Sequence, residues 1–485
     1  MENIQNTYSE LPKDFHRSTR PTPVSKPKML SINYELANEL SIDTSDEMQL
    51  LEYFSGNTVP KDAEAIAMAY AGHQFGNFVP QLGDGRAILI GEIYDKSGKL
   101  NDIQLKGSGV TAFSRQGDGR SAIGPVIREY IISEAMYAMN IPTTRALAAI
   151  STGENVYRET ALKGGVLTRV SNSLIRVGTF EFFRARQDLE NLRVLADFSI
   201  KRLYPNIFDQ KNKYLLLFDA IARKQSILIS KWMSIGFIHG VMNTDNFSIS
   251  GETIDYGPCA FMEAYDPDTV FSSIDRHGRY KYSNQPKIGL WNLSCLAGCL
   301  LPIMDGDDNE KEEKIRESLE NFSKDVNSRI NIEMTKKIAL RETKESNELT
   351  KSLLSIMHQN GADFTLTFRS LSSAIKGNDD HFLKCFDNHE EPKDWLQKWK
   401  KLLKKEKGNI DENLVENLNS INPIYIPRNH MIERAIREYQ ENNTHKIMDE
   451  LLEVTANPFL DQKNKEDYVL PAKEDEQVTQ TFCGT

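Results

Sequence analysis

The sequence contains no long hydrophobic run. No stretch approaches about 18 uninterrupted apolar residues, the length at which a membrane-spanning helix is expected, so we expect no membrane span. Residues 1–23 lack the apolar core of a secretory signal, and they include acidic side chains, which are unusual in organelle transit peptides. These absences lead us to expect a cytoplasmic protein.

Cysteine is also scarce, and acidic residues outnumber basic ones. Five cysteines in 485 residues do not make a disulfide framework, which agrees with a reducing compartment. Cys483 differs from the others, since an exposed thiol in a terminal segment would be open to redox chemistry. Lysine and arginine total 59 against 69 acidic residues, which gives a formal net charge of −10. Because nucleic-acid binding rests mainly on cationic side chains that face phosphates, we expect no nucleic-acid partner.

The chain does contain the pattern of a large α+β protein in four segments. Residues 1–60 are a mixed N-terminal extension with one expected helix, and residues 61–180 hold short alternating runs separated by glycines, typical of a small sheet. Helical periodicity dominates residues 181–380 and 381–485, and the last segment ends in the cysteine-bearing tail. A β-rich lobe followed by a larger helical lobe is typical of protein kinases. We therefore predict a two-lobed, protein-kinase-like fold with mostly helical extensions at both ends.

The stretch "IHGVMNTDNFSISGETIDYGP" resembles the catalytic loop of kinase-like enzymes, which reads H-x-D-x-x-x-x-N and is followed by D-x-G. His239, Asn246, Asp255 and Gly257 occupy the positions that the pattern requires, but Val241 stands where the catalytic aspartate belongs. The alternating residues and the Gly-Glu turn between the two halves predict a β-hairpin. Asparagine and aspartate supply the oxygen ligands that Mg²⁺ prefers in phosphate sites, so the loop predicts a magnesium site.

Val241 cannot accept a proton from an incoming hydroxyl, as a kinase base must. Three interpretations remain: an inactive ATP-binding scaffold, a kinase of proteins or small molecules that uses another base, or an enzyme that attacks a different phosphorus atom. Asp245 lies beside the candidate metal ligand Asn246, which places a carboxylate within reach of a metal-bound phosphate. It is our candidate catalytic residue.

The tetrapeptide Gly-Asp-Gly-Arg occurs twice, at 83–86 and at 117–120. Glycines in such loops let backbone N–H groups approach a phosphate closely, although Gly-Asp-Gly is also an ordinary turn. Lys106 lies between these loops, and a lysine on a strand serves phosphates as a point charge. Glu129, on a helix expected over 125–140, offers the carboxylate that would hold it, as in kinases.

Two arginines, Arg169 and Arg176, follow an expected strand in the region that should join the two lobes. Kinases place adenine near such a position, whereas arginine is a better partner for phosphate than for a base. If both arginines bind phosphate, the triphosphate points in a direction that kinases do not use. Structural salt bridges explain these arginines equally well on sequence alone.

Taken together, these motifs resemble the selenoprotein O family of protein-kinase-like pseudokinases that act as protein adenylyltransferases. The resemblance covers most of the chain and includes "AYAGHQFG", "QLGDGRAILIGE", "IQLKGSG", "SRQGDGR", "HGVMNTDN", "TIDYGPCAFM", "NQPKIGLWNL", "ADFTLTFR", "NPIYIPRNH" and the tail "TFCGT". It implies that ATP binds in a flipped orientation. AMP is then transferred to Ser, Thr or Tyr hydroxyls of other proteins, and pyrophosphate leaves.

The resemblance also implies roles for particular residues. Asp245 would be the proton acceptor, Asn246 and Asp255 would bind Mg²⁺, with Mn²⁺ as a possible substitute, and Glu129 would support Lys106. The expected ATP contacts are Gly83, Gly85, Arg86, Lys106, Asp118, Gly119, Arg169, Arg176 and Asp255. We expect a monomer whose partners are its protein substrates. Some family members carry selenocysteine or cysteine near the C-terminus, so a redox switch at Cys483 is a further hypothesis.

Overall fold

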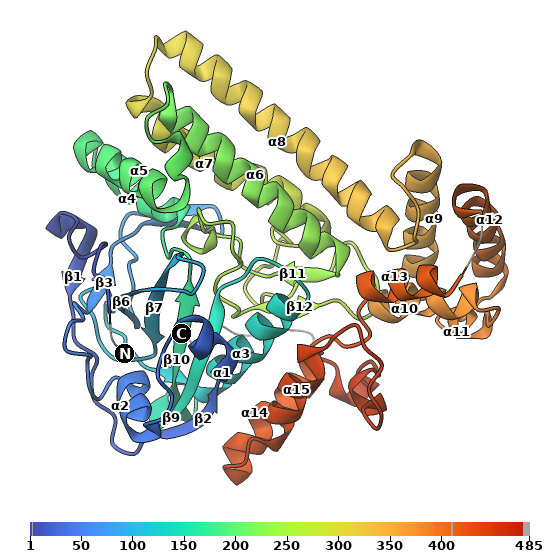
Figure 1. Cartoon of the computed structure of the whole chain (residues 1–485), viewed down its shortest axis with the longest axis horizontal. Coiled ribbons are helices and arrows are strands. Elements are labelled where there is room, and N and C mark those ends of the chain that lie inside the picture. Colours follow the sequence, from blue (N-terminus) through green and yellow to red (C-terminus); the bar gives the residue numbers. More distant parts are fainter. Residues whose placement is uncertain (2, 409–410, 479–485) are drawn as a thin grey trace.

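A computed structural model describes residues 1, 3–408 and 411–478, so Cys483 lies outside the described residues. An antiparallel sheet occupies one side of the molecule, and helices from the later part of the chain occupy the other (Figure 1). The strands follow the order β1-β3-β6-β7-β10-β9-β2, with β8 paired to β10. The predicted α+β fold class is confirmed. The sheet consists of β1 (His16–Ser18), β2 (Lys28–Ile32), β3 (Ile66–Met68), β6 (Ala87–Tyr94), β7 (Leu100–Lys106), β8 (Ser121–Ala122), β9 (Arg145–Tyr157) and β10 (Ala161–Ser171).

The first 60 residues do more than form a helical extension. Their helices are α1 (Tyr34–Glu39), the one expected from sequence, and α2 (Glu47–Ser55). The strands β1 and β2 lie at the two ends of the strand order, where β1 pairs with β3 and β2 with β9. Both strands are short and β2 carries a register shift, so neither gives the sustained alternation that predicts a strand from sequence.

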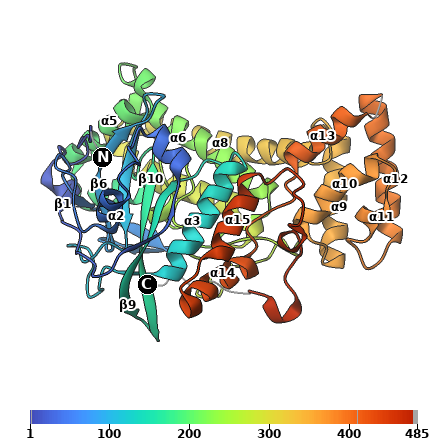
Figure 2. The same cartoon turned by 60° about the horizontal axis from the view of Figure 1, so that its bottom comes forward.

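Helix α3 (Ile123–Ala138) packs against β9 and β10 and presents Glu129 to the end of β7. Its isoleucines and valine are buried at helical spacing, which explains why the sequence predicted this helix. On its other side α3 contacts α14 (Asn429–Asn442) and α15 (Lys446–Ala456), which lie along it in Figure 2. The C-terminal helices therefore cover the helix that carries Glu129.

The helical region begins directly after β10. Its first helices are α4 (Val177–Ala185), α5 (Leu189–Leu203), α6 (Lys213–Ser234), α7 (Gln285–Leu300) and the long α8 (Asp308–Lys336). The others are α9 (Lys344–Asn360), α10 (Phe364–Ile375), α11 (Asp380–Leu383), α12 (Glu390–Lys407) and α13 (Glu412–Ile421). By length and composition alone, the helical stretch Tyr282–Ile303 could cross a membrane, and half of its apolar window is buried inside the protein. It includes α7, which packs between α4, α6 and α8.

The loop that carries Asn246 and Asp255 does not form the predicted hairpin. Gly251 turns the chain in a left-handed conformation (φ +76°), but the two arms bond to other segments. Ile249 N donates to Ile175 O (3.1 Å), and Thr253 N donates to Pro142 O (3.0 Å). The alternating apolar residues that suggested a hairpin are instead buried in the core. The strands that pair are β11 (Phe237–His239) and β12 (Cys259–Phe261), which flank this loop.

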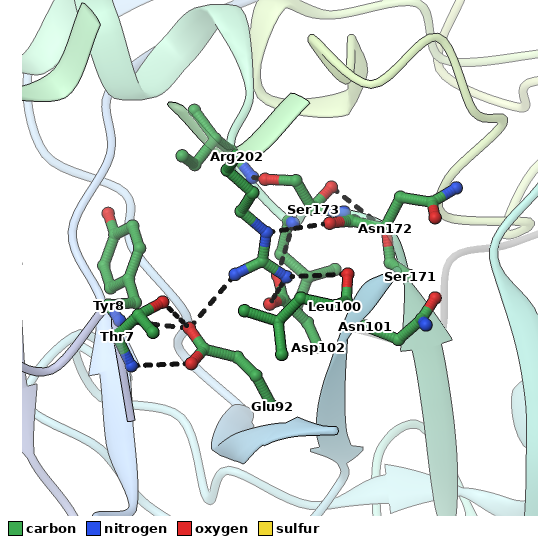
Figure 3. Close-up of polar contacts among 12 residues, drawn as sticks. Thr7, Tyr8, Glu92, Leu100, Asn101, Asp102, Ser171, Asn172, Ser173 and Arg202 are labelled. Atoms are coloured by element: carbon green, nitrogen blue, oxygen red, sulfur yellow. Dashed lines mark hydrogen bonds and ion pairs between the residues drawn. The ribbon is translucent and has the colours of Figure 1, made fainter. Parts of the chain in front are cut away.

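A buried charge cluster fastens α5 to the sheet (Figure 3). Arg202 of α5 donates to Asp102 Oδ1 (2.5 Å) and Glu92 Oε1 (3.1 Å) on β7 and β6. Glu92 also accepts hydrogen bonds from the backbone N–H groups of Thr7 (2.6 Å) and Tyr8 (3.0 Å). The N-terminal segment and the first long helix of the helical region are therefore held by the same carboxylate.

Candidate active site

Four charged side chains meet at the end of β7. Lys106 Nζ lies 2.7 Å from Glu129 Oε2 and 2.6 Å from Asp255 Oδ1. Arg169, from β10, contacts the same two acids: its Nε donates to Glu129 Oε1 (2.9 Å) and its Nη2 to Asp255 Oδ1 (2.5 Å). Two cations and two carboxylates, which lie far apart in sequence, thus form one ionic cluster.

Asp255 is held in an unusual state within this cluster. Its backbone has a φ of +64°, in the left-handed region that non-glycine residues rarely adopt, and such conformations gather at functional sites. Burial alone would raise the pKa of Asp255, but the charges of Arg169 and Lys106 hold that pKa well below its usual range. Asp255 is therefore a carboxylate at neutral pH, as a metal ligand must be.

Behind the cluster lies a second layer that the sequence did not reveal. Arg169 Nη1 donates to Gln104 Oε1 (3.3 Å), and Gln104 Nε2 donates to Asp84 Oδ2 (3.1 Å). Asp84 in turn faces Arg176, with 3.7 Å between Oδ1 and Nη1, while the Arg176 guanidinium lies over the Tyr70 ring. Strand alternation could have identified Gln104, because residues two apart on β7 share one face with Lys106.

The two Gly-Asp-Gly-Arg loops need glycine for reasons of packing. At Gly83 (φ +71°) a Cβ would lie 2.3 Å from the Phe113 ring, and at Gly119 (φ +65°) it would lie 2.1 Å from Gly109. Neighbouring residues differ in what they contact: Asp84 is buried behind the cluster, whereas Asp118 pairs with Arg158 at 2.8 Å.

Other residues of the first loop lie close to the cluster. The backbone O of Arg86 accepts from Gly107 N at 2.6 Å, which joins this loop to the residue after Lys106. Gly85 fits tightly, since a Cβ there would lie 3.0 Å from Phe113 O. The loop is thus fixed against the end of β7.

Asp245 lies in a short 3₁₀ turn, η3 (Thr244–Asn246), and only 9% of its surface is exposed. Burial raises the pKa of its carboxyl group to about 6. Gln74 Nε2 approaches Oδ2 at 3.5 Å, and Oδ1 has no hydrogen-bond partner among the described residues. Asn246 Nδ2 donates to Val241 O (3.1 Å), so the amide is oriented by the residue that replaces the kinase base.

A hairpin formed by β4 (Gly72–Gln74) and β5 (Asn77–Val79) closes over Asp245. His73 N donates to Thr244 Oγ1 (2.6 Å), whose hydroxyl donates to Glu181 Oε2 (2.5 Å). His73 Nδ1 lies 2.6 Å from Glu181 Oε1. The motif "AYAGHQFG" therefore fastens the turn that carries Asp245.

One further group of side chains has a composition that could hold a metal. Ligand atoms of His73, Glu181 and Cys295 lie within 4.8 Å of one another. Burial, together with the negative charge of Glu181, raises the pKa of the Cys295 thiol to about 12. The Glu181 carboxylate is already occupied by His73 and by the Thr244 hydroxyl, contacts that hold the β4–β5 hairpin against the turn with Asp245. We therefore assign this group a structural role.

The main site fits a nucleotide and a divalent metal. Asn246 and Asp255 offer oxygen ligands on one loop, and Lys106 and Arg169 supply positive charge beside them. Asp245 Oδ1 and Arg176 Nε are buried and without hydrogen-bond partners among the described residues. Buried polar atoms of this kind are usually satisfied in the functional state, and phosphate oxygens and an acceptor hydroxyl would satisfy them.

Lys106 on a strand pairs with Glu129 on a helix, and the nearby loop offers oxygen ligands but lacks the kinase base. This combination defines a kinase-like, nucleotide-dependent transferase. The family model described as protein adenylyltransferase SelO matches residues 2–456, and the chain belongs to this family. A relative from Maridesulfovibrio salexigens, named protein nucleotidyltransferase YdiU, is 49% identical over 484 residues, 99% of this chain and 98% of that protein. A relative of the same name from Rhizobium johnstonii is 50% identical over 487 residues, 99% of this chain and 97% of that protein.

These matches confirm the family and the activity class predicted from the sequence. The chain is a protein adenylyltransferase of this family, so its substrates include a nucleotide and proteins, and a divalent metal accompanies such chemistry.

Proposed function

We propose that this chain transfers AMP from ATP to Ser, Thr or Tyr hydroxyls of proteins, with Asp245 as the proton acceptor. The observation that carries the proposal is the buried Asp245 carboxylate beside Asn246, whose Oδ1 has no hydrogen-bond partner in the described part of the chain. The acceptor oxygen attacks the α-phosphorus, and the bond from that phosphorus to the bridging oxygen breaks. The hydroxyl proton passes to Asp245, and pyrophosphate leaves with the bonding electrons.

The positive charges of the site support a flipped nucleotide. Arg169 and Arg176 are each only 2% exposed, so phosphates that reach them must enter deeply. Together with Lys106 they would stabilise the charge that develops on departing pyrophosphate, which is usually the largest contribution to this kind of catalysis. The nucleotide would also contact Gly83, Gly85, Arg86, Asp118 and Gly119.

Asn246 and Asp255 would hold Mg²⁺, or Mn²⁺ in its place. When bound, the metal would neutralise phosphate charge and orient the phosphates for in-line attack. We further propose that the protein acts as a cytoplasmic monomer, with the nucleotide between the β-rich segment 61–180 and the helical segment 181–380.

The test is transfer from ATP labelled at either the α- or the γ-phosphate, with Mg²⁺ and a general protein acceptor. Covalent label from the α-position alone, released as AMP, supports the proposal, and Asp245→Asn should abolish it while ATP still binds. Label from the γ-position alone would identify a kinase with a different base. ATP binding without label from either position would support the alternative, an inactive scaffold.

A further inference from the structure

A cavity of about 650 Å³ lies beside the β4–β5 hairpin and is lined mainly by residues 274–287. Its lining is strongly cationic, although the whole chain has a net charge of −10. Arg276 and Lys287 form no ion pair among the described residues, while Lys281 pairs with Asp268 at the surface (2.7 Å). The basic lining residues are Arg276, His277, Arg279, Lys281 and Lys287.

Arg279 gives this cavity the character of a built anion site. Its Nε and Nη2 are buried and lack hydrogen-bond partners among the described residues, while its guanidinium stacks over the Trp291 ring at 4.4 Å. The acid in the lining, Asp275, is occupied by backbone groups: it accepts from Arg279 N (2.9 Å) and Tyr280 N (2.7 Å). Burying two guanidinium donors without partners is costly, and an anion in the cavity would lower this cost by balancing the positive charge.

The cavity borders the loop that carries the proposed proton acceptor. Tyr280 OH donates to Asn243 Oδ1 (2.6 Å), and Phe75 N donates to the same oxygen (3.0 Å). Asn243 precedes Asp245 by two residues, and the rings of Phe75 and Tyr280 pack at 5.2 Å. The wall of the cavity is therefore linked through Asn243 to the loop of the candidate site.

We propose that this cavity, which we call the basic pocket, binds a carboxylate side chain of the acceptor protein. This inference rests on the proposed function, because it assigns the pocket a role in choosing the protein that receives AMP. An acidic residue near the acceptor hydroxyl would pair with Arg279, and Arg276 and Lys287 would attract it. Opposite charge at such a pocket speeds association and fixes register, and its effect weakens as salt rises.

The test uses two short peptides that share one tyrosine and differ only in carrying flanking glutamates or glutamines. Binding is measured by fluorescence anisotropy, and AMP transfer is measured with α-labelled ATP. The variant Arg276→Glu/Lys287→Glu leaves the partly buried Arg279 in place and so limits the risk of misfolding. The matched control is Lys398→Glu/Lys401→Glu, which reverses two exposed charges on α12.

We expect the wild-type protein to bind the glutamate peptide about tenfold more tightly than the glutamine peptide. The pocket variant should remove this preference and raise KM for the glutamate peptide, with KM for ATP and the control variant unchanged. Equal binding of both peptides, or a preference that survives in the pocket variant, would overturn the inference. If the glutamate peptide binds through the pocket but no AMP is transferred to any acceptor, the pocket stands and the proposed function fails.

Discussion

Asp255 faces both Lys106 and Arg169 and does so from a left-handed backbone conformation. Asp255→Asn removes one of two negative charges and leaves these cations facing each other. We expect AMP transfer to fall by about three orders of magnitude or more, because metal and phosphate charge would no longer be balanced. The measurement is the initial rate with α-labelled ATP at saturating Mg²⁺. Asp308→Asn, at the exposed start of α8, is the control, and near-normal activity of Asp255→Asn would refute the metal assignment.

Val241 tests the orientation of the nucleotide. Val241→Asp introduces the aspartate that the kinase motif has at this position and leaves Arg169 and Arg176 unchanged. We expect no transfer from γ-labelled ATP, because a base at this position does not turn the nucleotide round. The assay compares α- and γ-label on the same acceptor protein. Robust γ-transfer by the variant would contradict the flipped orientation.

At the scale of secondary-structure elements, the β4–β5 hairpin controls the space around Asp245. A Cβ at Gly72 would lie 2.5 Å from Asp245 Oδ1, although the backbone there is not left-handed. Gly72→Ala should therefore fold, displace the carboxylate and lower the rate of AMP transfer by about tenfold or more. ATP binding, measured by calorimetry, should be little changed. Gly298→Ala, where a Cβ meets nothing within 4 Å, is the matched control.

Just beyond the end of α8, a buried lysine should make stability depend on pH. Lys337 is 2% exposed, and burial lowers the pKa of its amine from 10.5 to about 7. Between pH 7 and 10.5 the unfolded chain therefore binds this proton more tightly than the folded protein does. The free energy of unfolding is highest, with respect to this group, above about pH 10.5 and decreases as the pH falls towards 7. Lys337→Met removes the cost, although the amine's contact with the Phe368 ring (4.6 Å) offsets part of it.

We expect Lys337→Met to stabilise the protein at pH 7 by an amount on the order of 2 kcal/mol, and by less at pH 9.5. Thermal unfolding at the two pH values measures the difference. Lys336→Met changes the exposed neighbour and should leave Tm nearly unchanged at both. A Tm gain that is equal at pH 7 and 9.5 would show that packing, and not titration, is responsible.

The sequence predicted those elements whose pattern is long or whose chemistry is specific. The strands around Lys106, the helix with Glu129 and the loop from His239 to Asp255 follow from periodicity and motif spacing, and the structure brings Lys106, Glu129 and Asp255 together. The prediction of a hairpin between Asn246 and Asp255 was wrong, because alternating apolar residues are found both in paired strands and in irregular segments buried in a core. Strand alternation places Gln104 on the same face as Lys106, but its bonds to Arg169 and Asp84 depend on tertiary packing and could not be predicted.

At the scale of the whole molecule, the C-terminal helices hold both sides of the candidate site. Asn429, at the start of α14, accepts from Arg128 Nη1 (3.0 Å), and Arg128 is the neighbour of Glu129 on α3. Arg428 reaches the chain beyond Asp255, with Nη1 at 3.3 Å from Glu263 Oε1. The motif "NPIYIPRNH" thus joins two parts of the site that come from different segments of the chain.

Arg428 is the residue on which this connection depends most. Its side chain is fully buried, and it pairs with Asp363 Oδ2 (2.8 Å) and donates to Val469 O (3.1 Å) as well as approaching Glu263. Arg428→Met would remove the arginine that pairs with Asp363 and Glu263, and breaking a buried ion pair in this way costs about 3–5 kcal/mol. We expect Tm to fall by several degrees and AMP transfer to be lost with it. Arg437→Met, on the exposed side of α14, should leave both unchanged.

The rate of AMP transfer, measured at one temperature well below Tm and at one near it, distinguishes a structural role of Arg428 from a catalytic one. Well below its lowered Tm the variant should regain much of the wild-type rate, because the charge lost is remote from the phosphates. A variant that stays inactive while fully folded would show that the C-terminal helices set the geometry of Glu129 and Asp255 directly. An unchanged Tm would instead mean that Glu263 and Asp363 find other partners, and that the connection through α14 is dispensable.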